Sequence, residues 1–147
     1  MSKQQRTKRK FKSRGQAVVE FALVMVFFLM ILLAVLDLGR AYLSAVALEN
    51  AAAEGALFGS ENPTCHTSGD CPDPDNIEYR VKHESPVGLL NPSDPGYTVD
   101  IGDTGGYLPG TQLIVTATYP FHPVIPLLSA AGADPIWLSR SARQMIP

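Results

Sequence analysis

The two cysteines of the 147-residue sequence lie close together and are the side chains best placed for covalent chemistry. Cys65 and Cys71 enclose five residues, so in an oxidising compartment they could form a disulfide across a small loop. Closing a loop of this size stabilises the fold by about 2–2.5 kcal/mol. His66 and Asp70 lie between the cysteines and make a metal site the alternative, but their spacing is not a usual zinc pattern. We therefore expect a disulfide and no metal, with free thiols as the remaining possibility.

No other group of residues forms a recognisable catalytic motif. His66, His83 and His122 each lie in a loop or near the end of an expected strand, without a nucleophile in a known local context. The serines lack the Gly-x-Ser-x-Gly pattern of hydrolases. Four acidic residues between positions 70 and 78 could bind calcium weakly, but the regular geometry of a calcium loop is missing. We expect no enzymatic activity and no cofactor.

Charge is distributed very unevenly along the chain. The formal net charge is −2, but residues 1–15 contain seven of the twelve basic residues and no acidic one. Residues 16–147 have five basic and fourteen acidic residues, and therefore a formal charge of −9. A basic segment directly before an apolar one is more simply a membrane topology signal than a nucleic-acid site. No nucleic-acid partner is expected.

An apolar segment follows the basic residues. Residues 21–36 contain no charge, and extension back to Ala17 gives twenty residues interrupted only by Glu20. Twenty helical residues rise about 30 Å, the hydrocarbon thickness of a bilayer. A membrane span is therefore favoured over a buried core helix. The positive-inside rule places the N-terminus in the cytoplasm and everything after Asp37 outside it, as in a single-pass protein of the cell membrane.

Three fates are open to this segment. A secretory signal peptide would need a small-x-small cleavage site, which residues 45–47 supply, but Asp37 and Arg40 lie between that site and the apolar run. An uncleaved signal anchor is simpler. The third fate depends on Glu20, because a carboxylate at the centre of a membrane helix costs about 2.5–3.5 kcal/mol. Near the interface the cost is lower, so Glu20 could also reach back to the cytoplasmic surface.

Glu20 lies five residues after Gly15, where the basic segment ends. A short basic leader that ends in glycine, with glutamate five positions later and then an apolar helix, resembles the type IV prepilin cleavage region. The resemblance implies that a membrane-embedded aspartic prepilin peptidase cuts between Gly15 and Gln16. The new amine of Gln16 and the Glu20 carboxylate, in the same helix or in a neighbouring subunit, could then neutralise each other.

Further along the chain, the resemblance points to one particular family of pilin-like proteins. Residues 14–59 resemble the TadE family, the pilin-like proteins of tight-adherence pilus systems. The motif residues that carry the resemblance are Phe21, Asp37, Gly39 and Arg40, followed by the Glu-Asn-Ala-Ala-Ala-Glu-Gly-Ala run at 49–56. The resemblance implies a pilin-like fold, a role in pilus assembly or initiation, and a prepilin peptidase, other pilin-like subunits and the pilus machinery as partners.

The expected fold is α+β: one long N-terminal helix followed by a small antiparallel β-sheet. We divide the chain into a leader (1–15), a transmembrane and extended helix (16–59), a turn-rich connector (60–76) and a β domain outside the cytoplasm (77–147). Alternating residues predict strands at 77–82, 97–101, 112–119 and 136–142, with Pro120 ending the third.

A stripe of apolar and small residues continues along the predicted helix beyond the membrane, at intervals of three or four residues. It could pack on another helix or on the β domain of the same chain. Its members are Leu38, Tyr42, Ala45, Leu48, Ala52 and Ala56.

The alternative function is that of an unprocessed, signal-anchored envelope protein whose external domain binds a ligand or partner.

Overall fold

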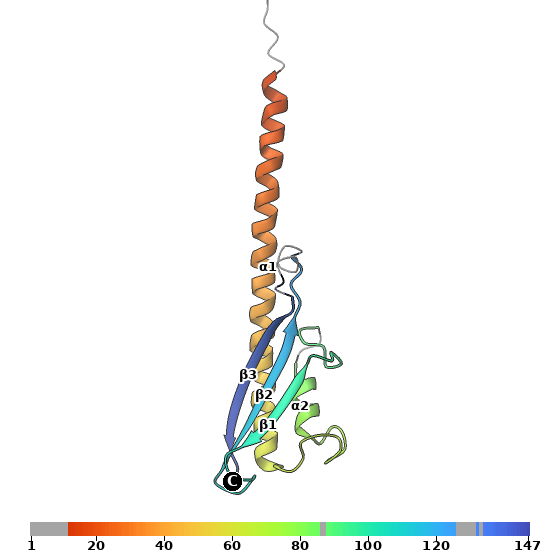
Figure 1. Cartoon of the computed structure of the whole chain (residues 1–147), viewed down its shortest axis with the longest axis vertical. Helices are drawn as coiled ribbons and strands as arrows, with labels where there is room; N and C mark the ends of the chain where they lie inside the picture. The colour runs from red at the N-terminus through yellow and green to blue at the C-terminus, as the bar shows by residue number, and fades with distance from the viewer. Residues whose placement is uncertain (1–11, 86–87, 126–131, 133) are drawn as a thin grey trace, which may run out of the picture.

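The computed structural model describes residues 12–85, 88–125, 132 and 134–147, and for residues 12–14 the backbone alone. Residues 1–11, most of the expected basic leader, lie outside the described part. The described chain contains helix α1 (Lys12–Glu61), helix α2 (Ile77–His83) and strands β1 (Thr98–Asp103), β2 (Gln112–Phe121) and β3 (Ile136–Met145). Figure 1 shows α1 as a long rod whose N-terminal half stands alone, while α2 and the sheet lie beside its C-terminal half. The α+β fold expected from the sequence is confirmed.

The length of α1 follows from its composition. Fifty residues form one helix, and no proline occurs among them to interrupt the backbone hydrogen bonds. Residues 21–36 within its first half are apolar on all sides, which suits lipid and not water. By length and composition this helix, and no other in the described residues, could cross a membrane.

The three strands form an antiparallel sheet in the order β1-β2-β3. β1 pairs with β2 from Thr98 opposite Thr118 to Asp103 opposite Leu113. β3 pairs with the other edge of β2 over all ten of its residues. The strands predicted near the observed β1, β2 and β3 are therefore found, and each extends beyond its predicted end.

The sequence predicts that Pro120 ends β2, and this prediction is wrong. β2 runs on to Phe121, and Pro120 lies opposite Trp137 of β3. β1 begins opposite Thr118, so this edge of β2 has no strand beside it at Pro120. A proline is tolerated at such a position because no ladder hydrogen bond on that edge needs its missing N–H.

One face of the sheet packs on α1. Leu113, Val115 and Ala117 alternate along β2 and are fully buried, while the residues between them face the other side. α1 contributes mainly small side chains, so the sheet lies close to the helix backbone. The buried residues of α1 in this core are Ala47, Leu48, Ala51, Ala52 and Ala56.

The strand predicted at residues 77–82 is wrong, because these residues form helix α2. Ile77, Tyr79 and Val81 alternate as in a strand, but Ile77 and Val81 are also four residues apart and lie on one face of a helix. Both side chains are fully buried against α1 and the sheet. The apolar residues therefore fit both the period of a strand and that of a helix, and burial against α1 and the sheet favours the helix.

Local hydrogen bonds also favour a helix here. The Asn76 side chain caps its first turn by accepting a hydrogen bond from the Tyr79 amide at 2.8 Å. Lys82 donates to Glu78 one turn away, also at 2.8 Å. Tyr97 joins this helix to the sheet because its hydroxyl donates to the Val81 carbonyl oxygen at 3.0 Å. Burial, with a smaller effect of Tyr119, raises the pKa of Tyr97 to about 12, so this donor stays protonated.

The apolar stripe on α1 divides between two environments. Ala45, Leu48, Ala52 and Ala56 are buried, and the last three contact the C-terminal domain of their own chain. Leu38 and Tyr42, the two residues nearest the apolar segment, are exposed. Small residues of the stripe therefore pack on the domain of their own chain.

Candidate functional site

The first part of the site is the free half of α1. Every residue from Gly15 to Leu36 is exposed, and Figure 1 shows no other element beside this part of the rod. Gly15 has open space around its Cα, with no atom within 4 Å of a Cβ built there. Glu20 lies in the next turn of the same helix and makes no ion pair with any side chain that the structure describes. The only charged group inside the apolar segment is therefore available to a partner.

The second part is the junction between this half and the C-terminal domain, at Asp37. The Asp37 carboxylate accepts a hydrogen bond from the Ile125 amide at 2.9 Å, across 88 positions of sequence. Its other oxygen lies 3.1 Å from the Arg40 guanidinium, one helical turn further on. The Asp37 side chain is only 7% exposed and that of Arg40 is 53% exposed. Asp37 thus fastens the chain after β2 to the end of the apolar helix.

Arg40 extends this contact to the sheet. Its guanidinium carbon lies 5.4 Å from the centre of the Phe121 ring, the last residue of β2, in a cation–π arrangement. Gly39, between Asp37 and Arg40, has open space around it. Two members of the predicted family motif therefore hold the domain at the helix, whereas Phe21 lies exposed within the apolar segment.

An apolar hollow of about 300 Å³ lies at the same junction. It is bounded on one side by α1 and on the other by the end of β2, the chain after it and the start of β3. The residues that line it are Ala34, Asp37, Leu38, Ala41, Phe121, Pro123, Ile125 and Ile136. Residues of the membrane segment and of the domain therefore share one surface.

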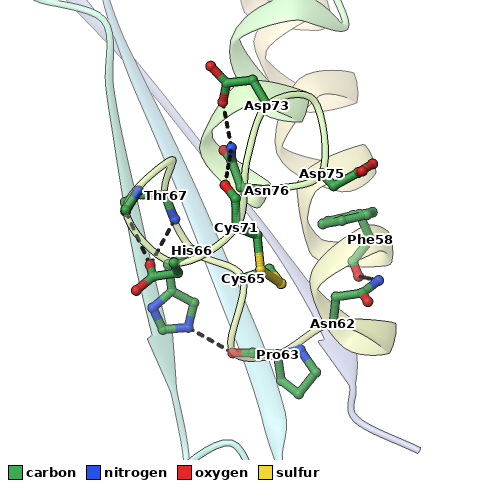
Figure 2. The surroundings of a disulfide bond; sticks show 12 residues. Phe58, Asn62, Pro63, Cys65, His66, Thr67, Cys71, Asp73, Asp75 and Asn76 are labelled. Carbon is green, nitrogen blue, oxygen red and sulfur yellow. Dashed lines mark hydrogen bonds between the residues drawn. A yellow bond between two sulfur atoms is a disulfide. The ribbon is translucent and has the colours of Figure 1, made fainter.

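The connector after α1 is closed by a disulfide between Cys65 and Cys71, whose Cα atoms are 5.2 Å apart. Figure 2 shows the loop beside the end of α1, with Nε2 of the His66 ring 2.8 Å from the Pro63 carbonyl oxygen. Because this oxygen is an acceptor, the ring nitrogen facing it is the donor. The Asn76 amide donates to the Cys71 carbonyl oxygen and to Asp73, so the loop leads directly into α2.

The other end of the disulfide loop touches the β1–β2 turn. The rings of His66 and Tyr107 lie 4.7 Å apart. Tyr107 has a positive φ of 59°, which is uncommon for a residue other than glycine. Asp103 holds this turn by accepting hydrogen bonds from the Tyr107 and Gly105 amides, and these bonds lower the pKa of its carboxyl. The loop and the turn form a structural corner at the end of the molecule farthest from the apolar segment (Figure 1).

No group of three or more metal-binding side chains lies together in the described part of the chain. Two of the acidic residues between positions 70 and 78 make local hydrogen bonds. Asp70 accepts hydrogen bonds from the Thr67 amide and hydroxyl, which lower its pKa, and Asp73 accepts from Asn76. The features with functional character are therefore the apolar helix and its junction with the domain.

Comparison with protein families gives a match to this same region. Residues 15–57 match the model described as TadE-like protein. The resemblance to the TadE family is thereby confirmed. The matched TadE-like segment contains Gly15, Glu20 and the Asp37–Arg40 junction, and it ends before the disulfide loop. No curated protein and no solved structure matches the chain.

The TadE-like match supports a pilus-related protein with an N-terminal membrane-spanning helix and single-pass anchoring. The sequence had pointed to Asp37 and Arg40 only as motif residues and as the limit of the apolar run. The amide of Ile125 was missed, because a main-chain donor 88 residues away leaves no mark in residue type or spacing.

Proposed function

We propose that this protein is a TadE-like, prepilin-like subunit that takes part in the assembly or initiation of a tight-adherence pilus. Removal of residues 1–15 by a prepilin peptidase precedes this role. The observation that carries the proposal is the family match over residues 15–57, which begins at Gly15 and covers the apolar helix. Other pilin-like subunits and the pilus machinery are the partners that this function requires.

The exposed apolar half of α1 explains how the protein could insert into the membrane and then assemble with other subunits. It first buries its surface in lipid, with the basic N-terminus in the cytoplasm and the C-terminal domain outside. During assembly it exchanges lipid for the helices of other subunits, so little apolar surface meets water at any stage. The domain need not move relative to α1 during this exchange, because the sheet and α2 already pack on the second half of the same helix.

Cleavage also provides a partner for Glu20. The new amine of Gln16 lies four residues from Glu20, about 6 Å along a helix. Within an apolar bundle an unpaired carboxylate or ammonium is costly, and a neighbouring opposite charge lowers this cost. The exposed position of Glu20 suits a pair either within one chain or with the amine of the next subunit.

Replacing Gly15 with leucine should abolish cleavage when the protein is produced together with its prepilin peptidase. A bare backbone fits closely in a protease cleft, and the leucine side chain removes that fit. Intact-mass spectrometry of the membrane fraction should show wild type without residues 1–15 and Gly15→Leu with them. Gly39→Ala, at another exposed glycine of α1, is the control and should be cleaved normally. A wild-type protein that keeps its leader would favour the unprocessed, signal-anchored alternative.

Glu20→Ala should be inserted and cleaved, but its assembly should fall at least about tenfold, because the amine of Gln16 is left unpaired among apolar helices. The amount of protein in sheared surface fractions, divided by the amount in membranes, measures this effect. Glu49→Ala removes an exposed carboxylate from the part of α1 beyond the apolar segment and serves as the control. Normal assembly of the Glu20 variant would contradict the charge-pair mechanism.

A further inference from the structure

The end of the C-terminal domain nearest the apolar segment carries an exposed apolar surface. We call Leu38, Val124, Ile136 and Trp137 the membrane-proximal rim. All four are exposed, Trp137 by 59%, and they come from α1, the chain after β2 and the start of β3. Three segments that are distant in sequence therefore present apolar side chains at one end of the domain.

We propose that this rim lies in the interfacial layer of the bilayer, with Trp137 as its anchor. Its occupant is thus lipid, namely the leaflet on the domain's side of the membrane. The proposal requires that α1 spans a membrane, but it does not depend on removal of the leader or on pilus assembly.

The depth of the rim follows from its contacts with α1. Ile136 and Leu38 line the same hollow as Ala34, which belongs to the apolar segment. Val124 precedes Ile125, whose amide is fixed to Asp37, the first residue after that segment. The domain therefore begins where the apolar segment ends, with no spacer between them.

The thickness of a bilayer places this level among the lipid headgroups. The hydrocarbon core is about 30 Å thick and the whole bilayer about 40–45 Å, so each interfacial layer is about 5–7 Å thick. Helical residues 37–40 extend about 6 Å beyond the apolar segment. Tryptophan is enriched at this depth, because its ring is apolar and its N–H needs a polar partner. The half-exposed Arg40 guanidinium lies at the same level, where lipid phosphates are found.

The orientation of Trp137 also fits lipid and not the protein core. Trp137 pairs with Pro120, and both lie on the face of the sheet that points away from α1. Its neighbour Leu138 points to the other face and packs against the core. The indole is therefore not needed to hold the sheet on the helix.

The chain contains a single tryptophan, so its fluorescence reports on this position alone. The full-length protein is reconstituted in phosphatidylcholine–phosphatidylglycerol nanodiscs, with acyl chains brominated near the carbonyl end, near the methyl end or not at all. We expect about twofold quenching by bromine near the carbonyl end, weaker quenching by bromine near the methyl end, and emission blue-shifted from that of an indole in water.

The matched control moves the tryptophan to the opposite end of the same strand. Met145 is also 59% exposed and lies eight residues from Trp137, about 26 Å along a strand. A Trp137→Phe, Met145→Trp protein should be unquenched and should emit as in water. Circular dichroism establishes that this variant keeps its fold.

Two results would overturn the proposal. Quenching of Trp137 no stronger than that of the control would place the rim in water. A blue shift that grows with the protein-to-lipid ratio, without bromine quenching, would show that a second copy covers the rim. Because no peptidase is present, absence of leader cleavage in cells would refute the proposed function and leave this result unchanged.

Discussion

Replacing Asp37 with alanine is expected to release the chain after β2 from α1 while leaving the sheet folded. The carboxylate accepts the Ile125 amide at 2.9 Å and is almost fully buried, and its substitution leaves that amide without its acceptor. Hydrogen bonds to a charged group contribute more than neutral ones, so we expect amide exchange of Ile125 to accelerate by about tenfold or more. Hydrogen-exchange mass spectrometry of the protein in nanodiscs measures this effect on the peptide that contains residues 121–125.

Two further variants separate the contributions at this junction. Asp37→Asn keeps an oxygen that can accept the amide but removes the charge, so its effect should be smaller than that of Asp37→Ala. Arg40→Gln removes the ion pair and the contact with Phe121 but leaves the acceptor in place, and it should increase exchange least. Peptides from β2 residues 113–117 are the internal reference and should keep wild-type protection. Unchanged exchange at Ile125 in Asp37→Ala would show that the hydrogen bond does not hold this segment.

The long helix and most of the sheet could be predicted because their signals are local. An uninterrupted apolar run without proline specifies α1, and β-branched alternation specifies β2. α2 was missed because Ile77 and Val81 satisfy both the strand and the helix period. Asn76 as a capping residue and the Glu78–Lys82 spacing were the local signals that favoured a helix.

The candidate site was predictable only in part, for a physical reason. Gly15 and Glu20 can be recognised because their spacing along one helix is itself the feature. The role of Asp37 depends on a backbone amide that the fold brings to it from residue 125. Nothing in the sequence indicates where Trp137 lies relative to the bilayer. Its level is set by the pairing of β3 with β2 and by the packing of both strands on α1.

The close packing of the sheet on α1 makes Gly59 a residue whose substitution should strongly destabilise the domain. A Cβ built at Gly59 would lie 2.3 Å from a methyl carbon of Leu113 and 2.7 Å from one of Ile77. Both side chains are fully buried, so neither has free space into which it can rotate. Gly59→Val must therefore push β2 and α2 away from the helix, and such overpacking costs about 3 kcal/mol.

For a domain of this size, 3 kcal/mol corresponds to a fall in Tm of about 10–20 °C, measured by near-ultraviolet circular dichroism of the full chain in detergent micelles. Gly39→Val is the matched control: the same substitution in the same helix, at a position with nothing within 4 Å of the new Cβ. It should leave Tm unchanged or slightly higher, because valine is a better helix former than glycine. Equal Tm values for the two variants would mean that the sheet does not rest on α1 at Gly59.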